Sequence, residues 1–83
     1  MDEPVLDLHG LRVAQAVNQT NAFLLAEQER GSISVRIITG HGTGALKQAI
    51  REVLSKHPAV ASSLSALRSD AATLVVLRPR PHR

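Results

Sequence analysis

The chain has 83 residues, with 10 lysines and arginines against 7 aspartates and glutamates, and a formal net charge of +3. This length predicts a single domain with a thin core, which leaves little room for a deep pocket. The absence of cysteine excludes disulfides and thiolate metal sites. Phe23 is the only aromatic residue, which argues against a protein that stacks bases on several rings.

The modest positive charge permits nucleic-acid binding but does not require it. No apolar run approaches the roughly 18 residues of a membrane-spanning helix. Asp2 and Glu3 also differ from the basic start of a signal peptide. These features predict a cytoplasmic protein without a membrane partner.

The first half of the chain predicts a strand, a helix and a second strand. Apolar and polar residues alternate over Val5–His9, which predicts a strand with one buried face that ends at Gly10. Helical spacing follows from about Arg12 to Arg30, and Gly31 is a natural C-terminal stop. The β-branched residues of Ser32–Ile38 predict the second strand.

The second half predicts a helix and two further strands. Apolar residues at helical spacing from Leu46 to Leu54 predict a helix that ends before Pro58. Residues Ala59–Leu67 predict a short, serine-rich edge strand, and residues 68–70 a turn. The apolar run Thr73–Leu77 predicts a central strand. We expect one domain over residues 1–77 and a basic tail over residues 78–83.

The order β-α-β-α-β-β predicts an α/β two-layer sandwich, with a four-stranded mixed sheet and both helices on one face. A helix joins the first two strands, so they must be parallel if they share a sheet, and right-handed crossovers place both helices on the same side. The period of two predicts which residues face the helices: Leu6, Leu8, Ile33, Val35 and Ile37. It predicts that three polar residues lie on the open face: Asp7, His9 and Arg36.

The first candidate site is the acid–imidazole turn that ends the first strand. Asp7 and His9 are two residues apart, so both side chains lie on one face and can lean together. A carboxylate beside an imidazole fixes its tautomer and raises its basicity, which suits His9 to general acid–base catalysis. Ligands bind at the carboxyl ends of parallel strands, which favours this interpretation. The alternative is an ordinary solvated polar pair.

This turn has too few evident ligands for a metal site made of protein side chains alone. A site needs three or more protein ligands, and only Asp7 and His9 are evident. A two-metal nuclease centre is therefore disfavoured. One divalent ion, magnesium or manganese, held by Asp7 together with a substrate phosphate, stays open.

The second candidate site is a glycine turn that leads into the second helix. Glycine lets a ligand approach the backbone closely, and the first N–H groups of a helix attract anions. The spacing is not that of a P-loop, so nucleotide hydrolysis is disfavoured. The alternative is a tight turn that needs glycine for geometry alone. The predicted nucleic-acid contacts are Gly10, Arg12, Arg36, Gly40, His41, Gly42, Thr43, Gly44 and Lys47.

The two motifs occur in order, Leu-Asp-Leu-His-Gly and then Thr-Gly-His-Gly-Thr-Gly, about thirty residues apart. With this pairing, the chain resembles the Smr (small MutS-related) domain from Val5 to about Leu77. The resemblance implies a fold like the C-terminal domain of a bacterial translation initiation factor. It also implies nuclease activity, with Asp7 and His9 associated with cleavage and the glycine motif with substrate binding. The family often has lysine where this chain has His41.

The resemblance further implies partners. Some Smr domains nick DNA, others cut messenger RNA on stalled or collided ribosomes, and many are joined to a MutS-like ATPase. We therefore expect nucleic acid, DNA or RNA or a ribosome, as the partner, and a covalently joined ATPase in the full protein.

Three hypotheses follow for the function. The first is an endonuclease, in which His9 moves a proton and Asp7 orients it or helps to hold one ion. The second is a non-catalytic module that docks a larger MutS-like ATPase on nucleic acid or a ribosome. The third is a structural protein–protein domain, which would leave both polar turns without a role.

Overall fold

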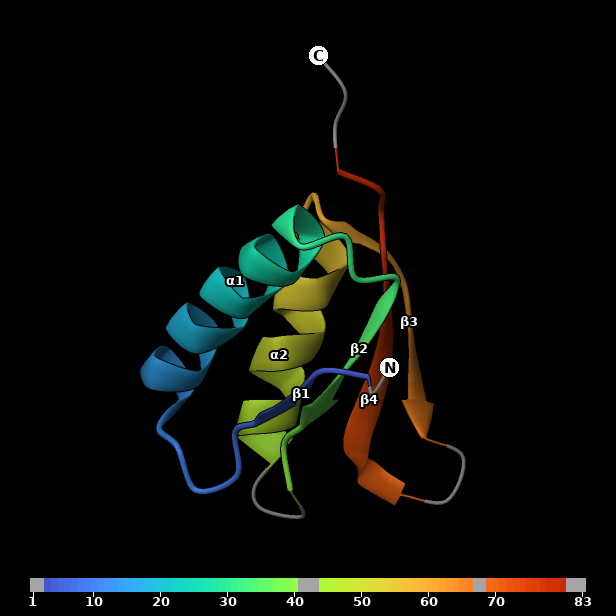
Figure 1. The fold of residues 1–83 in the computed structure, drawn as a ribbon. Coiled ribbons are helices and arrows are strands. Elements are labelled where there is room, and N and C mark those ends of the chain that lie inside the picture. The colour runs from blue at the N-terminus through green and yellow to red at the C-terminus, as the bar shows by residue number, and fades with distance from the viewer. Residues whose placement is uncertain (1–2, 41–43, 67–68, 81–83) are drawn as a thin grey trace.

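The computed structural model describes residues 3–40, 44–66 and 69–80. Its sheet has four strands in the order β1-β2-β4-β3. β1 and β2 are parallel, and both other pairs are antiparallel. Both helices cover the same face of the sheet (Figure 1), which confirms the predicted α/β two-layer sandwich. In chain order, the elements are β1 (Val5–Asp7), α1 (Val13–Glu29), β2 (Ser34–Ile38), α2 (Gly44–Lys56), β3 (Val60–Ala66) and β4 (Ser69–Leu77).

Three strand boundaries differ from the sequence prediction. β1 ends at Asp7 because the next residues form a turn, in which the Leu11 N–H donates to the Leu8 carbonyl at 3.1 Å. β2 begins only at Ser34, and the prediction that Ile33 faces the helices is wrong, because its side chain is 80% exposed. β4 begins at Ser69, inside the segment predicted as a turn.

The segment before β2 departs from the prediction because it belongs to the end of α1. The Ser32 N–H donates to the Glu27 carbonyl at 3.0 Å, and Gly31 has a φ of +84°. The Ser32 hydroxyl also donates to Glu27 Oε1 at 2.7 Å. Glu27 is therefore buried at the end of the helix.

The core fills the space between the helices and the inner face of the sheet. Val35 and Ile37 are fully buried, as the alternating pattern predicted, and Val75 of the central strand β4 lies beside them. Leu24 of α1 and Ile50 of α2 supply the facing side chains. This packing holds β1 and β2 in the register that positions the candidate site.

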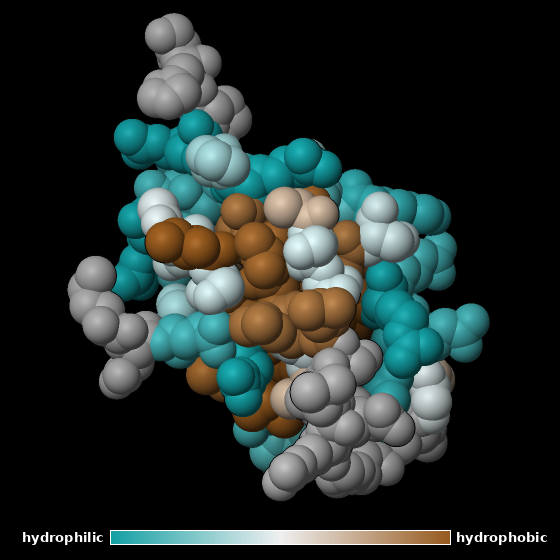
Figure 2. All heavy atoms as spheres, turned by 90° about the vertical axis from the view of Figure 1, so that its right-hand side faces the viewer, coloured by the Kyte–Doolittle hydropathy of each residue, from teal (hydrophilic) through white to brown (hydrophobic). Residues whose placement is uncertain are grey.

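The other face of the sheet carries no helix. Figure 2 views the side opposite the helices and shows apolar side chains gathered in the middle with a polar rim. Exposed apolar residues on this side include Val5 at the β1 edge and Leu64 of β3, which is 65% exposed. Within the described residues, no helix is long and apolar enough to cross a membrane.

Neighbouring leucines on α1 allow a direct test of the core. Leu24 is fully buried and Leu25 is 51% exposed. Leu24→Ala should cost about 2–5 kcal/mol through lost burial and a residual cavity. In a domain of this size, that lowers the melting temperature by roughly 10 °C or more. Leu25→Ala should stay within about 0.5 kcal/mol. Equal melting temperatures for the two variants would contradict this packing.

Candidate active site

The two predicted motifs meet because their strands are parallel neighbours. Asp7 pairs with Ile38 in the register of β1 and β2, and the Leu8 N–H extends the pairing with a bond of 2.7 Å to the Ile38 carbonyl. The segment that follows β1 and the start of α2 consequently lie at the same end of the molecule (Figure 1). This is the carboxyl end of the parallel strands, where α/β sheets bind ligands.

The acid and the imidazole are in direct contact. His9 Nδ1 lies 2.6 Å from Asp7 Oδ1, and the His9 backbone N–H donates to the same oxygen at 3.1 Å. Both side chains remain accessible, with 71% of His9 and 48% of Asp7 exposed. The pair therefore has a defined geometry and an open approach for a large substrate.

This contact changes the titration of the carboxyl group. The side-chain hydrogen bond with His9 is the main cause that lowers the pKa of Asp7, and the bond from the His9 backbone N–H adds to it. Both bonds favour the ionised carboxylate. Asp7 is therefore an anion at neutral pH and can orient the imidazole.

Gly40 links the glycine turn to the imidazole. It has a φ of +79°, which favours glycine, and a side chain here would place its Cβ 3.0 Å from the Cβ of His9. The backbone after β2 therefore packs closely against His9. Gly10 also has a positive φ, +78°, and lies in the tight turn that follows His9.

The predicted cations are placed differently from one another. Arg12 directly precedes α1, and Lys47 lies within the first turn of α2, so both are near the site end. Arg36 instead forms an ion pair with Glu3, with Nε 3.2 Å from Oε1. Arg36 pairs in register with Val5, so the structure does not bring it to the acid–imidazole contact. Its role in binding stays a prediction.

The remaining predicted contacts belong to the glycine turn itself. Gly44 is the first residue of α2 and is exposed. His41, Gly42 and Thr43 lie outside the described residues. Arg51 was not named among the candidate cations predicted from the sequence, although it follows Lys47 by one helical turn and lines the same hollow between α2 and the sheet. The spacing of four residues was the signal that could have found it.

The donor set does not build a metal centre from protein side chains alone. Among the described residues, no group of three or more histidines, cysteines or acids could hold a metal ion. Asp7 Oδ1 is already bound twice by His9. We therefore assign no chemical step to a metal ion, and the predicted magnesium or manganese site stays a prediction.

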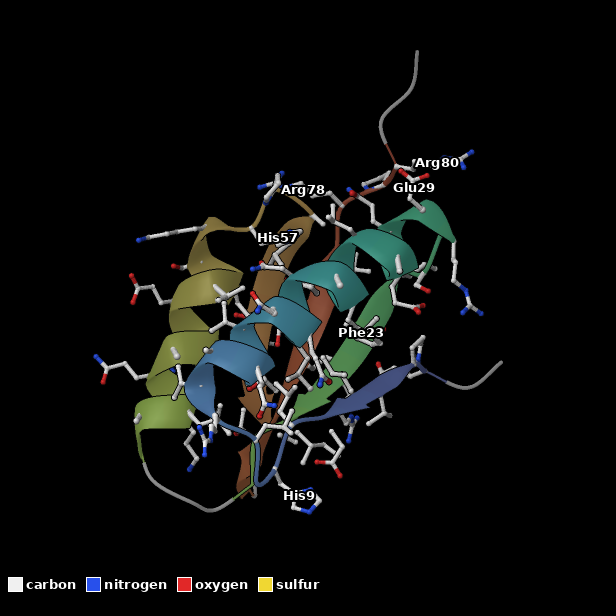
Figure 3. All side chains as sticks on the ribbon, turned by 90° about the vertical axis from the view of Figure 1, so that its left-hand side faces the viewer. His9, Phe23, Glu29, His57, Arg78 and Arg80 are labelled. Atoms are coloured by element: carbon white, nitrogen blue, oxygen red, sulfur yellow. The ribbon has the colours of Figure 1, made fainter. Side chains whose placement is uncertain are left out.

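Other polar residues lie far from this site. His9 projects at one end of the molecule, whereas His57, Arg78 and Arg80 lie at the opposite end (Figure 3). His57 Nδ1 accepts the Ala59 N–H at 3.0 Å, which holds the turn between α2 and β3. Arg80 lies beside Glu29, with Nη1 3.9 Å from Oε2. These side chains do not contribute to the acid–imidazole site.

The model of the Smr domain family matches residues 6–78. The chain belongs to the Smr domain family. It is 42% identical over 76 residues to endonuclease MutS2 of Anaeromyxobacter sp., which covers 88% of this chain and 9% of the relative. It is 36% identical over 84 residues to ribosome rescue factor SmrB of Shewanella baltica, which covers 95% of this chain and 48% of the relative.

Structural similarity supports the same assignment. The crystal structure of the Smr domain of Thermus thermophilus MutS2 superposes with a TM-score of 0.88 at 38% identity, covering 92% of this chain and 99% of that one. This Smr chain therefore spans about a tenth of the MutS2 relatives and about half of SmrB.

The contact between Gly40 and His9 predicts a specific defect. Gly40→Ala adds both an unfavourable φ, which costs about 1–2 kcal/mol, and a tight contact of 3.0 Å with the Cβ of His9. Gly31→Ala is the control, because Gly31 has a similar φ with no atom within 4 Å of the added Cβ. Gly40→Ala should destabilise the domain more and shift the His9 ring resonances in NMR spectra. His9 resonances that are the same in both variants would contradict the contact.

The lowered pKa of Asp7 predicts a pH dependence. In the folded domain, Asp7 should titrate below the ordinary aspartate value of 3.8, measured by carboxyl NMR. The contact therefore stabilises the fold fully when the pH is above the pKa of Asp7 in the unfolded chain. This stabilisation is lost as the pH falls through the lower pKa of Asp7 in the folded domain. His9→Ala should raise the pKa of Asp7 only part of the way, because the backbone N–H still donates. A midpoint in the His9→Ala variant at or below that of the original domain would contradict this assignment.

Proposed function

We propose that this Smr domain is an endonuclease that cuts phosphodiester bonds through Asp7 and His9, with RNA as the favoured substrate. The observation that carries the proposal is the 2.6 Å contact between His9 Nδ1 and Asp7 Oδ1 at the carboxyl end of the parallel strands. The names of the relatives, an endonuclease and a ribosome rescue factor, support a nuclease-type function.

The geometry gives each side chain a chemical role. The ionised Asp7 stabilises the tautomer in which Nδ1 of His9 carries the proton, which leaves Nε2 as the base. In RNA, Nε2 takes the proton from the 2′-hydroxyl while its oxygen attacks phosphorus. The bond from phosphorus to the 5′-oxygen then breaks, and that oxygen takes a proton from His9 or water. The products are a 2′,3′-cyclic phosphate and a 5′-hydroxyl.

The choice of RNA rests on the number of groups at the site. DNA has no 2′-hydroxyl, so water must attack, and enzymes commonly activate that water with a metal ion. The described residues bring only Asp7 and His9 together, and these two groups suffice when the nucleophile belongs to the substrate. DNA nicking remains an outcome of the test below.

The glycine turn and nearby cations hold the phosphate in this proposal. The first N–H groups of α2 have no partner within the helix and carry partial positive charge. Arg12, directly before α1, adds a cation at the same end of the molecule. The close packing of Gly40, the residue at the start of the glycine turn, on His9 supports this arrangement.

We also propose that the domain acts within a larger protein or assembly. The relatives it matches are much longer, and one is named for ribosome rescue. A joined ATPase, as in a MutS-like protein, and a ribosome are the proposed partners.

A cleavage assay tests the proposed chemistry. The domain should cut a structured RNA, and His9→Ala should reduce the rate by about 10²–10⁴-fold, the usual contribution of general acid–base catalysis. Asp7→Asn should also slow the reaction, because the amide cannot stabilise the imidazolium. His57→Gln is the control, since His57 lies at the opposite end of the molecule. Supercoiled plasmid, and EDTA with either substrate, complete the assay.

Two results would contradict this proposal. One is an unchanged cleavage rate in His9→Ala, which would remove the imidazole from the mechanism. The other is salt-sensitive binding without any cleavage of either substrate, which would support a docking module instead.

A further inference from the structure

The charged side chains of this domain are sorted in space. Within the described part of the chain, most carboxylates form ion pairs with cations away from the site: Glu3 with Arg36, Glu27 with Arg30, Glu29 with Arg80 and Glu52 with Lys56. Arg12, Lys47 and Arg51 take part in none of the ion pairs formed among those residues. Arg78 also has no ion pair there, but it lies at the end of the molecule opposite His9, where its Nε donates to the Val60 carbonyl at 3.2 Å. Of the other three, Arg12 lies at the start of α1, and Lys47 and Arg51 lie on α2.

Lys47 and Arg51 form an unusual pair on α2. They are four residues apart, so their side chains lie on the same face of the helix. Like charges at this spacing destabilise a helix by a few tenths of a kcal/mol. On the same helix, Glu52 and Lys56 show the favourable arrangement at the same spacing, with an ion pair of 3.0 Å. Destabilisation of a helix by like charges is expected where binding of a ligand of opposite charge compensates for it.

These two cations flank a hollow of about 170 Å³ between α2 and the sheet. Its floor is apolar and consists of Ile50 and Leu54, which are both buried. Ser63 of β3 and Thr73 of β4 line its far side. The hollow therefore combines positive charge, hydroxyl groups and a small apolar surface.

Strand register explains why the hydroxyls face the helix. Thr73 pairs with Ile37, and Ser63 pairs with Val75. Ile37 and Val75 are fully buried on the helix side, so Thr73 and Ser63 point to that side as well. Serine and threonine here replace the apolar side chains that the inner face otherwise carries. One side of the hollow is therefore polar, at a position where apolar side chains would extend the core.

The hollow is adjacent to the candidate active site. Thr39 lines it, and the next residue, Gly40, packs against His9. Two consecutive residues therefore contact the hollow and His9, which places the hollow next to the segment that packs on the imidazole.

We propose that this hollow is a second nucleotide subsite, in which Lys47 and Arg51 hold the phosphate next to the cleaved bond. The sugar or base of that nucleotide lies on Ile50 and Leu54, and the hydroxyls of Ser63 and Thr73 bond to it. Pockets that enclose drug-sized ligands usually measure about 300–1,000 Å³, so this hollow of about 170 Å³ can cover only part of a nucleotide that the strand holds in place. The position of the cleaved bond rests on the proposed function, whereas the binding of the strand does not.

Salt dependence of binding gives the first test. A fluorescein-labelled single-stranded RNA is titrated by anisotropy at several salt concentrations, with and without Lys47→Ala and Arg51→Ala. Because the two cations hold one phosphate, their combined loss should reduce the slope of log K against log salt by about 0.7 for a single strand. Lys56→Ala removes the same charge from the same helix and should leave the slope unchanged.

A substrate series gives the second test. Uncharged methylphosphonate linkages are placed one at a time along the RNA. One position should weaken binding to the original domain and have no further effect on the double variant, which is the coupling expected of a direct contact. If the RNA is cut, this position should neighbour the cleaved bond. Inorganic phosphate and a nucleoside monophosphate should not displace the labelled RNA when each is added at the concentration at which RNA saturates the domain.

The outcomes separate this inference from the proposed function. Equal slopes for the double variant and Lys56→Ala, or the absence of a coupled phosphate, would overturn the subsite. Displacement by phosphate or a monophosphate would replace it with a small-molecule site. If the domain binds RNA with the coupled phosphate but never cuts it, the proposed nuclease function fails and the subsite stands.

Discussion

The close packing of Gly40 on His9 is the constraint on which the candidate site depends. A side chain at Gly40 would put its Cβ 3.0 Å from that of His9, so glycine lets the two segments pack together without displacing either. The parallel register of β1 and β2 delivers both turns to this point. The acid–imidazole turn and the residues that follow β2 are thereby in contact, although about thirty residues of chain separate them.

The charged side chains of the domain differ in whether they form ion pairs, depending on where they lie. Ion pairs along the flank of β1 and at the far ends of the helices neutralise most carboxylates with nearby cations. Exposed pairs of this kind add little stability. Among the described residues, they leave Arg12, Lys47 and Arg51 without a carboxylate partner, as well as Arg78 at the end of the molecule opposite His9.

The sequence predicted the element order, the helix layer and the meeting of the two motifs, because alternation and helical spacing report burial directly. The prediction for Ile33 was wrong because the Ser32 N–H donates to the Glu27 carbonyl at the end of α1. An alternation pattern does not reveal this hydrogen bond. The pairing of Arg36 with Glu3 depends on how the chain enters β1. The hollow needs the register of β3 on β4, which local sequence does not determine.

The two edges of the sheet have a further consequence for how this domain meets other proteins. β1 is only three residues long, and β3 carries register irregularities at Val60/Ser62 and Ser65/Ala66. Short or bulged edge strands are poor templates for an additional strand. Sheet extension by another chain is therefore discouraged on both sides. The domain can sit at high local concentration in a large assembly without polymerising through its backbone.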